Sequence, residues 1–412
     1  MRVERSGFRV GVRSALTLTV SDEAVVNFTL QPGGVDQTVT VTEERPLVNV
    51  TSGALGGLAD ARRVAELPLN GRNYMDLVLL QPGISQHKNL GTSSSTVGLW
   101  FSSNGAPLMS NSYLLDGAIT TNLTNATSAA QDGSTLGVEG IREFRVLTNS
   151  YSAEYGMTMG GQVTVVTKSG TNTLHGSLFE YFRNSALDAR NFFDYKTAAS
   201  NRRLPPFTRN HFGASAGGPI RKDKTFFFGV YEGLRQSLGV TTISSVIPAA
   251  CHVATKNPCI TGGGNVVAVM RPLLDLYPLP NLSGNKFTFP FTQPTTSDYG
   301  QGRADHIFSP ADSLFGRYTI TNTRVTDPLN YPQFRTVRSS RNQYATLSEN
   351  HVFSPMLLST LRFSFSRTHQ ASPSPSGLIG PQYSFVTGEE IGLMNIGGVT
   401  QMGPNVGPTE LK

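Results

Sequence analysis

Three residues of the chain have the spacing that surrounds the nucleophilic serine of many hydrolases. Gly213, Ser215 and Gly217 match the G-x-S-x-G pattern. That chemistry needs a strand before the serine and a helix after it, so that the hydroxyl is exposed on a sharp turn. Here Gly218, Pro219 and a charged turn follow instead. A serine inside a β-strand is therefore the better interpretation, and we predict no catalytic residue.

The two cysteines, Cys251 and Cys259, are close together in a stretch rich in Pro and Gly. Two thiols without a second pair of ligands make a poor zinc site. In an oxidising compartment a local disulfide is expected instead. The sequence also has no H-E-x-x-H motif and no Walker A motif. We therefore expect neither a metal site nor a cofactor.

Asp116 is the remaining residue that invites a chemical role, as a lone catalytic carboxylate. Gly117 follows it directly. Because Asp and Gly both suit turn conformations, a turn is the better interpretation.

The composition indicates what kind of elements must position these residues. Only 15% of the 412 residues are charged, while Gly occurs 42 times and Pro 24 times. Such a chain favours strands, turns and long loops over long helices. The net charge is +6, but Lys and Arg are scattered and form no stripe interleaved with aromatic residues. We therefore expect a solvated basic surface and no nucleic-acid partner. There is no run of eighteen apolar residues that would predict a transmembrane helix.

The second part of the chain, residues 173–412, is predicted to consist of antiparallel strands joined by connections that are alternately long and short. The predicted strands are 174–183, 211–218, 225–235, 302–308, 313–322, 342–353 and 357–368, and 372–412 is predicted to be loop. Long loops on one side and short turns on the other are typical of an outer-membrane barrel. Seven strands are an odd number and too few to close such a barrel, so we expect the chain to be a fragment of a longer protein.

The strands also alternate in polarity. Leu361, Phe363 and Phe365 alternate with Arg362 and Ser364, and residues 313–320 alternate in the same way. This pattern predicts one face toward lipid and one toward a wet lumen. A soluble β-sandwich has the same period, with the faces toward core and water. The asymmetry of the connections favours the barrel.

The first part of the chain divides in two. The β-rich runs 15–20, 24–30 and 37–41 predict the last part of an Ig-like β-sandwich over residues 1–43. Short helical patterns at 60–67 and 73–80, followed by Val- and Thr-rich strands at 143–147 and 162–167, predict an α+β domain over residues 44–172. The whole is thus predicted to be mainly β.

Several motifs recur in a fixed order and carry a family resemblance. They are LPLNGRN at 67–73, LQPG at 80–83, YLLDG at 113–117, YSAEYG at 151–156 and GGQVTVVTKSGTN at 160–172. In this order they resemble TonB-dependent receptors, in particular the Oar-like group with an N-terminal carboxypeptidase-regulatory-like domain. The resemblance spans almost the whole chain and implies no peptidase, since no zinc ligand set accompanies it.

The resemblance implies an outer-membrane transporter whose plug domain sits inside a transmembrane β-barrel. Such a protein takes up a ligand, here unidentified and for example a peptide or a carbohydrate, when the plug is remodelled with energy supplied through TonB. The expected partners are TonB, the extracellular ligand and outer-membrane lipid. The plug motif residues are Arg72, Asp116, Gly117 and Tyr155. A surface binding or adhesion protein anchored by the barrel is the alternative function.

A short extended segment of such receptors, the TonB box, binds the partner. Residues Thr38, Val39, Thr40, Val41 and Thr42 are similar to such a box. An extended, β-branched segment can add as a strand to the edge of a partner's sheet. The same residues are equally suited to be the last strand of the sandwich, and both interpretations remain open.

Overall fold

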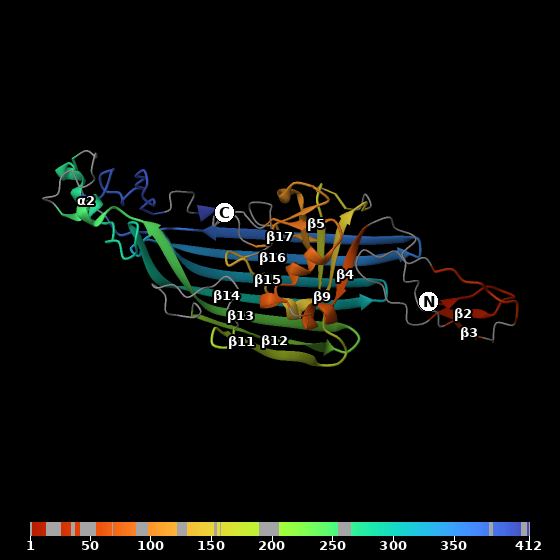
Figure 1. Cartoon of the computed structure of the whole chain (residues 1–412). Helices are drawn as coiled ribbons and strands as arrows, with labels where there is room; N and C mark the ends of the chain where they lie inside the picture. Colours follow the sequence, from red (N-terminus) through yellow and green to blue (C-terminus); the bar gives the residue numbers. More distant parts are fainter. Residues whose placement is uncertain are drawn as a thin grey trace.

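The computed structural model describes residues 2–13, 26–33, 38–41, 55–67, 69–87, 98–121, 130–151, 155–156, 158–188, 206–253, 265–378, 382–404 and 410–411 (Figure 1). Among these residues no helix has both the length and the apolar character needed to cross a membrane.

An eight-stranded antiparallel sheet, here called the wall, is the largest element. Its strands pair in chain order: β11 (His175–Asn184), β12 (Phe207–Arg221), β13 (Thr225–Ser245), β14 (Lys286–Ser309), β15 (Asp312–Pro328), β16 (Arg335–Ser354), β17 (Leu357–Ala371) and β18 (Glu410–Leu411). Within the described residues β11 and β18 are the two edges, so the sheet is an open wall. All seven predicted strands are confirmed.

Two predictions about the wall were wrong in detail. Strand β14 begins at Lys286 rather than 302. Pro290 and Pro294 argue against a strand in the sequence, but they lie where β14 pairs with β13 alone, and proline is tolerated at such an edge. Strand β18 lies in the stretch predicted to be loop, where Leu411 pairs with Gln370 on the edge of β17. Pairing with an existing strand edge, rather than any local pattern, makes these two residues a strand.

The two faces of the wall differ in polarity, as predicted. Leu361 and Phe363 on β17 are 70% and 67% exposed, whereas Arg317 and Thr319 on β15 are 3% and 2% exposed. Cross-strand pairing puts Arg317 and Ser364 on one face, which contacts Asp116, and Leu361 and Phe363 on the opposite, outward face. An outward face rich in exposed Leu and Phe suits lipid.

A mixed five-stranded sheet lies against the inward face of the wall (Figure 1). Its strands, in spatial order, are β4 (Leu55–Asp60), β9 (Ile141–Asn149), β10 (Gln162–Thr167), β7 (Ser112–Leu115) and β8 (Ala118–Ile119), and only β10 and β7 are parallel. The sheet and its connections, residues 55–170, are called the inner unit. Its apolar core includes Val78, Phe101 and Val146, all fully buried.

The helices of the inner unit are short. Helix α1 (Ala61–Glu66) begins where the Asp60 side chain accepts a hydrogen bond from Arg63 N, which stabilises its first turn. The second predicted helix is a 3-10 helix, η2 (Tyr74–Leu80), capped by Asn73. The remaining short elements are η1 (Asn70–Arg72), β5 (Ile84–Gln86), β6 (Phe101–Ser103), η3 (Leu108–Ser110) and η4 (Val138–Gly140).

The N-terminal residues form a three-stranded sheet in the order β1 (Arg2–Val3), β2 (Val10–Arg13) and β3 (Thr38–Val41). The sequence did not predict β1 or β2, and the predicted run 15–20 lies outside the described residues. Residues 26–30 were predicted as strand but form none, because Phe28 and Leu30 pack their side chains over Gly11 instead of joining the ladder.

At one end of the wall, the long connections pack together around a second apolar core, here called the cap (Figure 1). It contains η5 (Ala249–His252), η6 (Ala268–Met270) and α2 (Arg271–Leu274), together with residues of 329–334 and 382–404. Tyr277 and Tyr331 meet edge to face in its centre, with ring centroids 5.4 Å apart.

Candidate functional site

The turn between β7 and β8 places Asp116 and Gly117 at the face of the inner unit that meets the wall. Both have positive φ, 48° and 79°, so the predicted turn is confirmed. The positive φ of Gly117 favours glycine, and a Cβ there would also displace the Arg362 guanidinium of β17, which lies against it.

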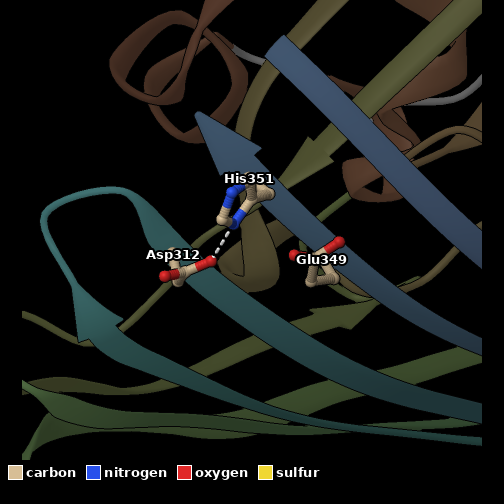
Figure 2. Close-up of side chains that lie close together, drawn as sticks. All are labelled: Asp312, Glu349 and His351. Carbon is tan, nitrogen blue, oxygen red and sulfur yellow. Dashed lines mark hydrogen bonds and ion pairs between the residues drawn. The ribbon is translucent and has the colours of Figure 1, made fainter. Parts of the chain in front are cut away.

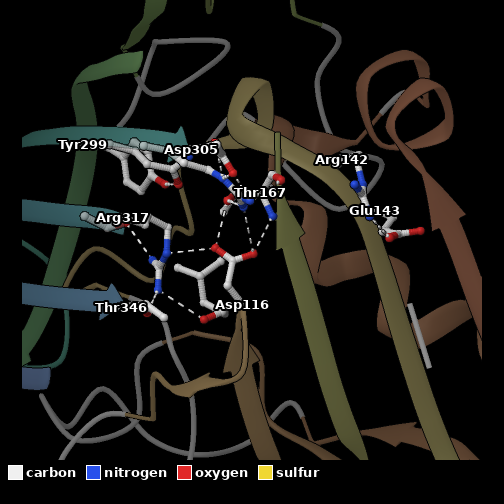
Figure 3. A network of polar contacts seen from close by, with 12 residues as sticks. Asp116, Arg142, Glu143, Thr167, Tyr299, Asp305, Arg317 and Thr346 are labelled. Carbon is white, nitrogen blue, oxygen red and sulfur yellow. Dashed lines mark hydrogen bonds and ion pairs between the residues drawn. The ribbon is translucent and has the colours of Figure 1, made fainter. Parts of the chain in front are cut away.

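The Asp116 carboxylate joins the inner unit to the wall (Figure 3). Within the inner unit its two oxygens accept hydrogen bonds from the Thr167 backbone N–H at 2.9 Å and the Thr167 hydroxyl at 2.8 Å. From the wall, Arg317 Nε lies 2.9 Å and Arg303 Nη1 3.7 Å from the same carboxylate. These four residues, Asp116, Thr167, Arg303 and Arg317, are called the latch.

The latch is buried and its charges are held by further hydrogen bonds. The Arg317 side chain is fully buried and donates to Thr346 Oγ1 at 2.6 Å and to the Leu115 carbonyl at 3.1 Å. Arg303 also pairs with Asp305 on its own strand at 2.7 Å. Removing one partner from such a buried ion pair leaves an uncompensated charge and costs about 3–5 kcal/mol. The latch therefore holds the ends of β7 and β10 on the wall, but only while its geometry is complete.

Arg72, the second predicted motif residue, makes a separate contact with the wall. Its guanidinium forms an ion pair with Glu139 at 2.7 Å and lies over the rings of Phe179 and Tyr181 on β11, 4.3 Å and 4.6 Å from their centroids. A cation over two aromatic faces is attracted by their negative quadrupoles. The structure thus places Arg72 and Asp116 at the same interface, against different strands.

A third contact was not predicted. The fully buried Glu232 carboxylate on β13 accepts hydrogen bonds from the backbone N–H groups of Gly137 and Glu139, both at 3.0 Å, and lies 3.2 Å from His211 Nε2. It holds the turn that carries η4 onto the wall. The sequence does contain a signal for this contact: Glu232 stands between the apolar residues Val230 and Leu234 on the same face of the strand. Because a buried carboxylate needs hydrogen-bond partners, such a position indicates a contact with another part of the chain.

The other predicted residues lie elsewhere. Tyr155 packs edge to face against Tyr151 within the inner unit, with centroids 6.3 Å apart. Thr38, Val39, Thr40 and Val41 form β3, and Thr42 lies outside the described residues. Cys251 is disulfide-bonded and buried in the cap, while Cys259 lies outside the described residues, so their pairing stays a prediction. Ser215 is confirmed as a strand residue of β12, 2.8 Å from the Ser177 hydroxyl.

Asp312, Glu349 and His351 form a group whose ligand atoms lie within 4.8 Å of one another, near the short turns of the wall (Figure 2). His351 Nδ1 is bonded to Asp312. The sequence repeats His351 and Phe353 as His306 and Phe308, and each pair stacks edge to face, at 4.1 Å and 4.4 Å. His306 contacts Thr225 instead of a carboxylate, so the two hairpins share only the His–Phe pair at the end of a strand. We therefore assign Asp312, Glu349 and His351 a structural role.

Comparison with known proteins agrees with this architecture. Residues 166–409 match the family model described as an outer membrane beta barrel domain. The TonB-dependent transporter Oar of Myxococcus xanthus is 29% identical over 238 residues, which are 55% of this chain and 21% of that protein. The chain therefore spans about a fifth of the length of this curated relative. The crystal structure of the outer membrane transporter YddB from Escherichia coli superposes with a TM-score of 0.52 at 14% identity, covering 81% of this chain and 42% of that one. At that identity the likeness concerns the fold alone.

Proposed function

Since the chain belongs to the outer membrane beta barrel domain family and lies in the outer membrane, we propose that it acts as a TonB-dependent transporter in which the inner unit is the plug. Residues 44–172 are the plug domain of this proposal, and residues 173–412 contribute the wall of the barrel. The cap end of the wall faces the extracellular medium, and the short turns face the periplasm. The ligand is imported unchanged, without chemistry on it.

The observation that carries the proposal is the latch between plug and wall. A plug that only filled the barrel could be held by apolar packing over its whole surface. Here Asp116 and Glu232 hold it through buried charged contacts, and the Arg72 guanidinium adds its contact with the aromatic rings of β11. Charged contacts lose most of their strength once water reaches them, because the dielectric constant rises steeply. A plug held in this way can be released in discrete steps by a small displacement.

The order of the plug strands gives a route for the force. Strand β4 is the first described element after β3 and is an edge strand of the plug sheet. It pairs antiparallel with β9, which pairs with β10, and β10 ends at Thr167 of the latch. A pull from the N-terminal side of β4 therefore acts first on an edge strand and reaches the latch through two ladders.

Strand β3 is the proposed segment that binds TonB. It pairs in parallel with β2 and lies at the edge of its sheet among the described residues. An edge strand leaves backbone groups available on one side, so a partner strand can add there without displacing β2. In this arrangement one segment serves both as the last strand of its sheet and as the box.

Proline substitution in β3 tests the proposal, because proline removes a backbone donor and fixes φ. We expect Val39→Pro and Val41→Pro to leave ligand binding at the cell surface nearly unchanged and to abolish energised uptake. Ligand binding and uptake are measured on the same cells, with and without a functional TonB.

Thr29→Pro is the matched control, since Thr29 is exposed and outside any strand. It is expected to leave both properties unchanged. Loss of binding and uptake together in the β3 variants would indicate misfolding. Normal uptake in both would show that this segment is only a sheet strand and that any coupling segment lies elsewhere. Ligand binding without TonB-dependent uptake in the unaltered protein would favour a surface binding or adhesion protein, which needs no energy coupling.

A further inference from the structure

A cavity with about 670 Å³ of empty space, the solvent at its mouth included, lies between the plug and strands β14 to β16 of the wall. The plug side contributes Tyr113, Val163 and Val165, and the wall side contributes Gln301 and Asn342. Pockets that hold small ligands usually combine apolar walls with a few polar groups, as this cavity does.

The described residues that line this cavity include no charged side chain. A charged ligand buried here would lose its hydration without gaining an ionic partner, which is very costly. The lining therefore selects against ions, free amino acids and peptides with charged ends.

Polar groups in the lining are left without a partner. Gln301 and Asn342 are only 5% and 2% exposed, and within the described part of the chain Gln301 Nε2 and Asn342 Oδ1 have no hydrogen-bond partner. The Tyr299 hydroxyl bonds to Gln301 Oε1 at 2.7 Å, which leaves Nε2 as the available donor. An unsatisfied buried polar atom costs about 1–3 kcal/mol, so a ligand that offers both an acceptor and a donor is favoured here.

Four tyrosines also line the cavity, and all are at least nine-tenths buried: Tyr74, Tyr113, Tyr299 and Tyr344. Aromatic surface beside amide and hydroxyl groups suits a ligand with an apolar face and a polar rim. A neutral sugar ring has both, since its hydroxyls donate and accept hydrogen bonds and its C–H groups form an apolar face. We propose that this cavity is a binding site for one neutral sugar ring, which rests on the proposed function and names its substrate class.

The site adjoins the latch. Thr167 lines the cavity and donates to Asp116, and Thr319 lines it and accepts a hydrogen bond from Arg317 at 2.9 Å. A sugar in the cavity therefore lies against residues that hold the latch closed. Opening the latch would displace Thr167 and Thr319 together, one on each side of the cavity, and would allow a bound sugar to leave it.

Binding of defined probes to the purified full protein tests the proposal by saturation-transfer NMR. The probes are methyl glucoside, methyl galactoside and methyl xyloside as neutral sugars, glucuronate as a charged analogue, and N-acetylalanine amide as a neutral peptide unit. We expect at least one methyl glycoside to bind, and glucuronate to bind at least tenfold more weakly than its neutral counterpart.

Asn342→Leu and Gln301→Leu remove the two unpartnered groups. Asn342→Leu replaces an unsatisfied polar atom by an apolar group of similar shape and should remain folded. Gln301→Leu also removes the acceptor of the Tyr299 hydroxyl, so it is made together with Tyr299→Phe, which removes that donor, and circular dichroism checks its folding. Each is expected to weaken glycoside binding about five- to tenfold, since one hydrogen bond is worth roughly 1 kcal/mol. Gln343→Leu, the next residue on β16 but on the outward face, is the matched control and should bind as the unaltered protein does.

Three results would overturn the inference: no methyl glycoside binds at millimolar concentration, N-acetylalanine amide binds and the glycosides do not, or the two Leu variants bind glycosides unchanged. The outcome is separable from that of the proposed function, because binding by the purified protein needs no TonB. Glycoside binding without TonB-dependent uptake would contradict energised transport alone. TonB-dependent uptake without glycoside binding would contradict the sugar site alone.

Discussion

The interface between the inner unit and the wall, and the cap, both join parts of the chain that are far apart in sequence, but they do so by opposite means. At the inner unit–wall interface the contacts are buried charges: Asp116 with Arg317 and Arg303, and Glu232 with backbone donors. In the cap the contacts are apolar, centred on Tyr277 and Tyr331, with a disulfide at Cys251.

The difference concerns how each contact fails. Apolar burial weakens gradually as area is exposed, and a disulfide does not open under mechanical load without chemistry. A buried ion pair fails abruptly, since it depends on geometry and on the exclusion of water. We therefore expect the cap to keep its shape under load, and the inner unit–wall interface to open abruptly once its ion pairs break.

Asp116→Ala should have the largest effect on this comparison. It leaves the fully buried Arg317 side chain without its carboxylate, which costs about 3–5 kcal/mol. Amide hydrogen exchange at Thr167, whose N–H is bonded to Asp116, should accelerate at least a hundredfold, while exchange in the cap stays unchanged. Residue-resolved exchange on the purified protein measures both.

Two further variants control this result. Arg235→Ala removes an ion pair with Asp298 in which both side chains are more than a third exposed, and should cost less than about 1 kcal/mol. The double variant Asp116→Asn with Arg317→Met removes both charges, keeps a residue that tolerates the positive φ at 116, and should recover most of the loss. A double variant as unstable as the sum of both single changes would contradict the latch.

Replacing both cysteines should loosen the cap and leave the latch intact. A disulfide that closes the ring from 251 to 259 restricts the unfolded chain by roughly 2–3 kcal/mol. Cys251→Ala with Cys259→Ala is expected to raise the rate at which protease added to intact cells cleaves the cap. Intact-mass analysis of the unaltered protein under alkylating conditions should find no free thiol, and two alkylated cysteines would refute the pairing.

Tyr331→Phe is a milder change in the same region. The Tyr331 hydroxyl contacts the carbonyl oxygens of Ser245 at 3.0 Å and Thr400 at 2.9 Å, and the ring itself is fully buried. Loss of the hydroxyl keeps the packing and should cost about 1–2 kcal/mol. Faster exchange of the Thr400 amide, which donates to Ser245, would report it, whereas equal exchange would show that the apolar core alone holds the cap.

The wall could be predicted from the sequence because its signals are local. Alternation along 361–366 and the short turns fix strands and faces without knowledge of partners, and Arg317 was already expected on the polar face. The Asp60 hydrogen bond that begins α1 and the Asp116–Gly117 turn also depend on neighbouring residues only.

What could not be predicted depends on residues distant in sequence. Nothing near Asp116 in the sequence indicates that Arg317 will pair with it. Glu232 accepts the backbone hydrogen bonds of η4 only once β13 lies against the inner unit. The cap core joins three connections that each look like irregular loops. Such contacts are decided by tertiary packing, which no periodicity encodes.

Glu390 gives the smallest expected effect, a pH dependence confined to the cap. Its carboxylate accepts hydrogen bonds from the Ser376 backbone N–H at 2.8 Å and the Ser376 hydroxyl at 3.0 Å. These bonds favour the charged form, so the pKa of Glu390 lies below its ordinary value of 4.5, with the Ser376 N–H as the main cause. A carboxylate with a lowered pKa in the folded state stabilises that state fully above its unfolded pKa, and the contribution is lost as pH falls through the folded pKa.

The cap should therefore become easier to cleave with pepsin as the pH falls below about 4.5. Because Glu390→Gln cannot titrate, the ratio of its cleavage rate to that of the unaltered protein should fall toward one over the same range. A ratio that is constant with pH would show that the Glu390–Ser376 contact contributes nothing to the cap, whose stability would then rest on its apolar core and disulfide alone.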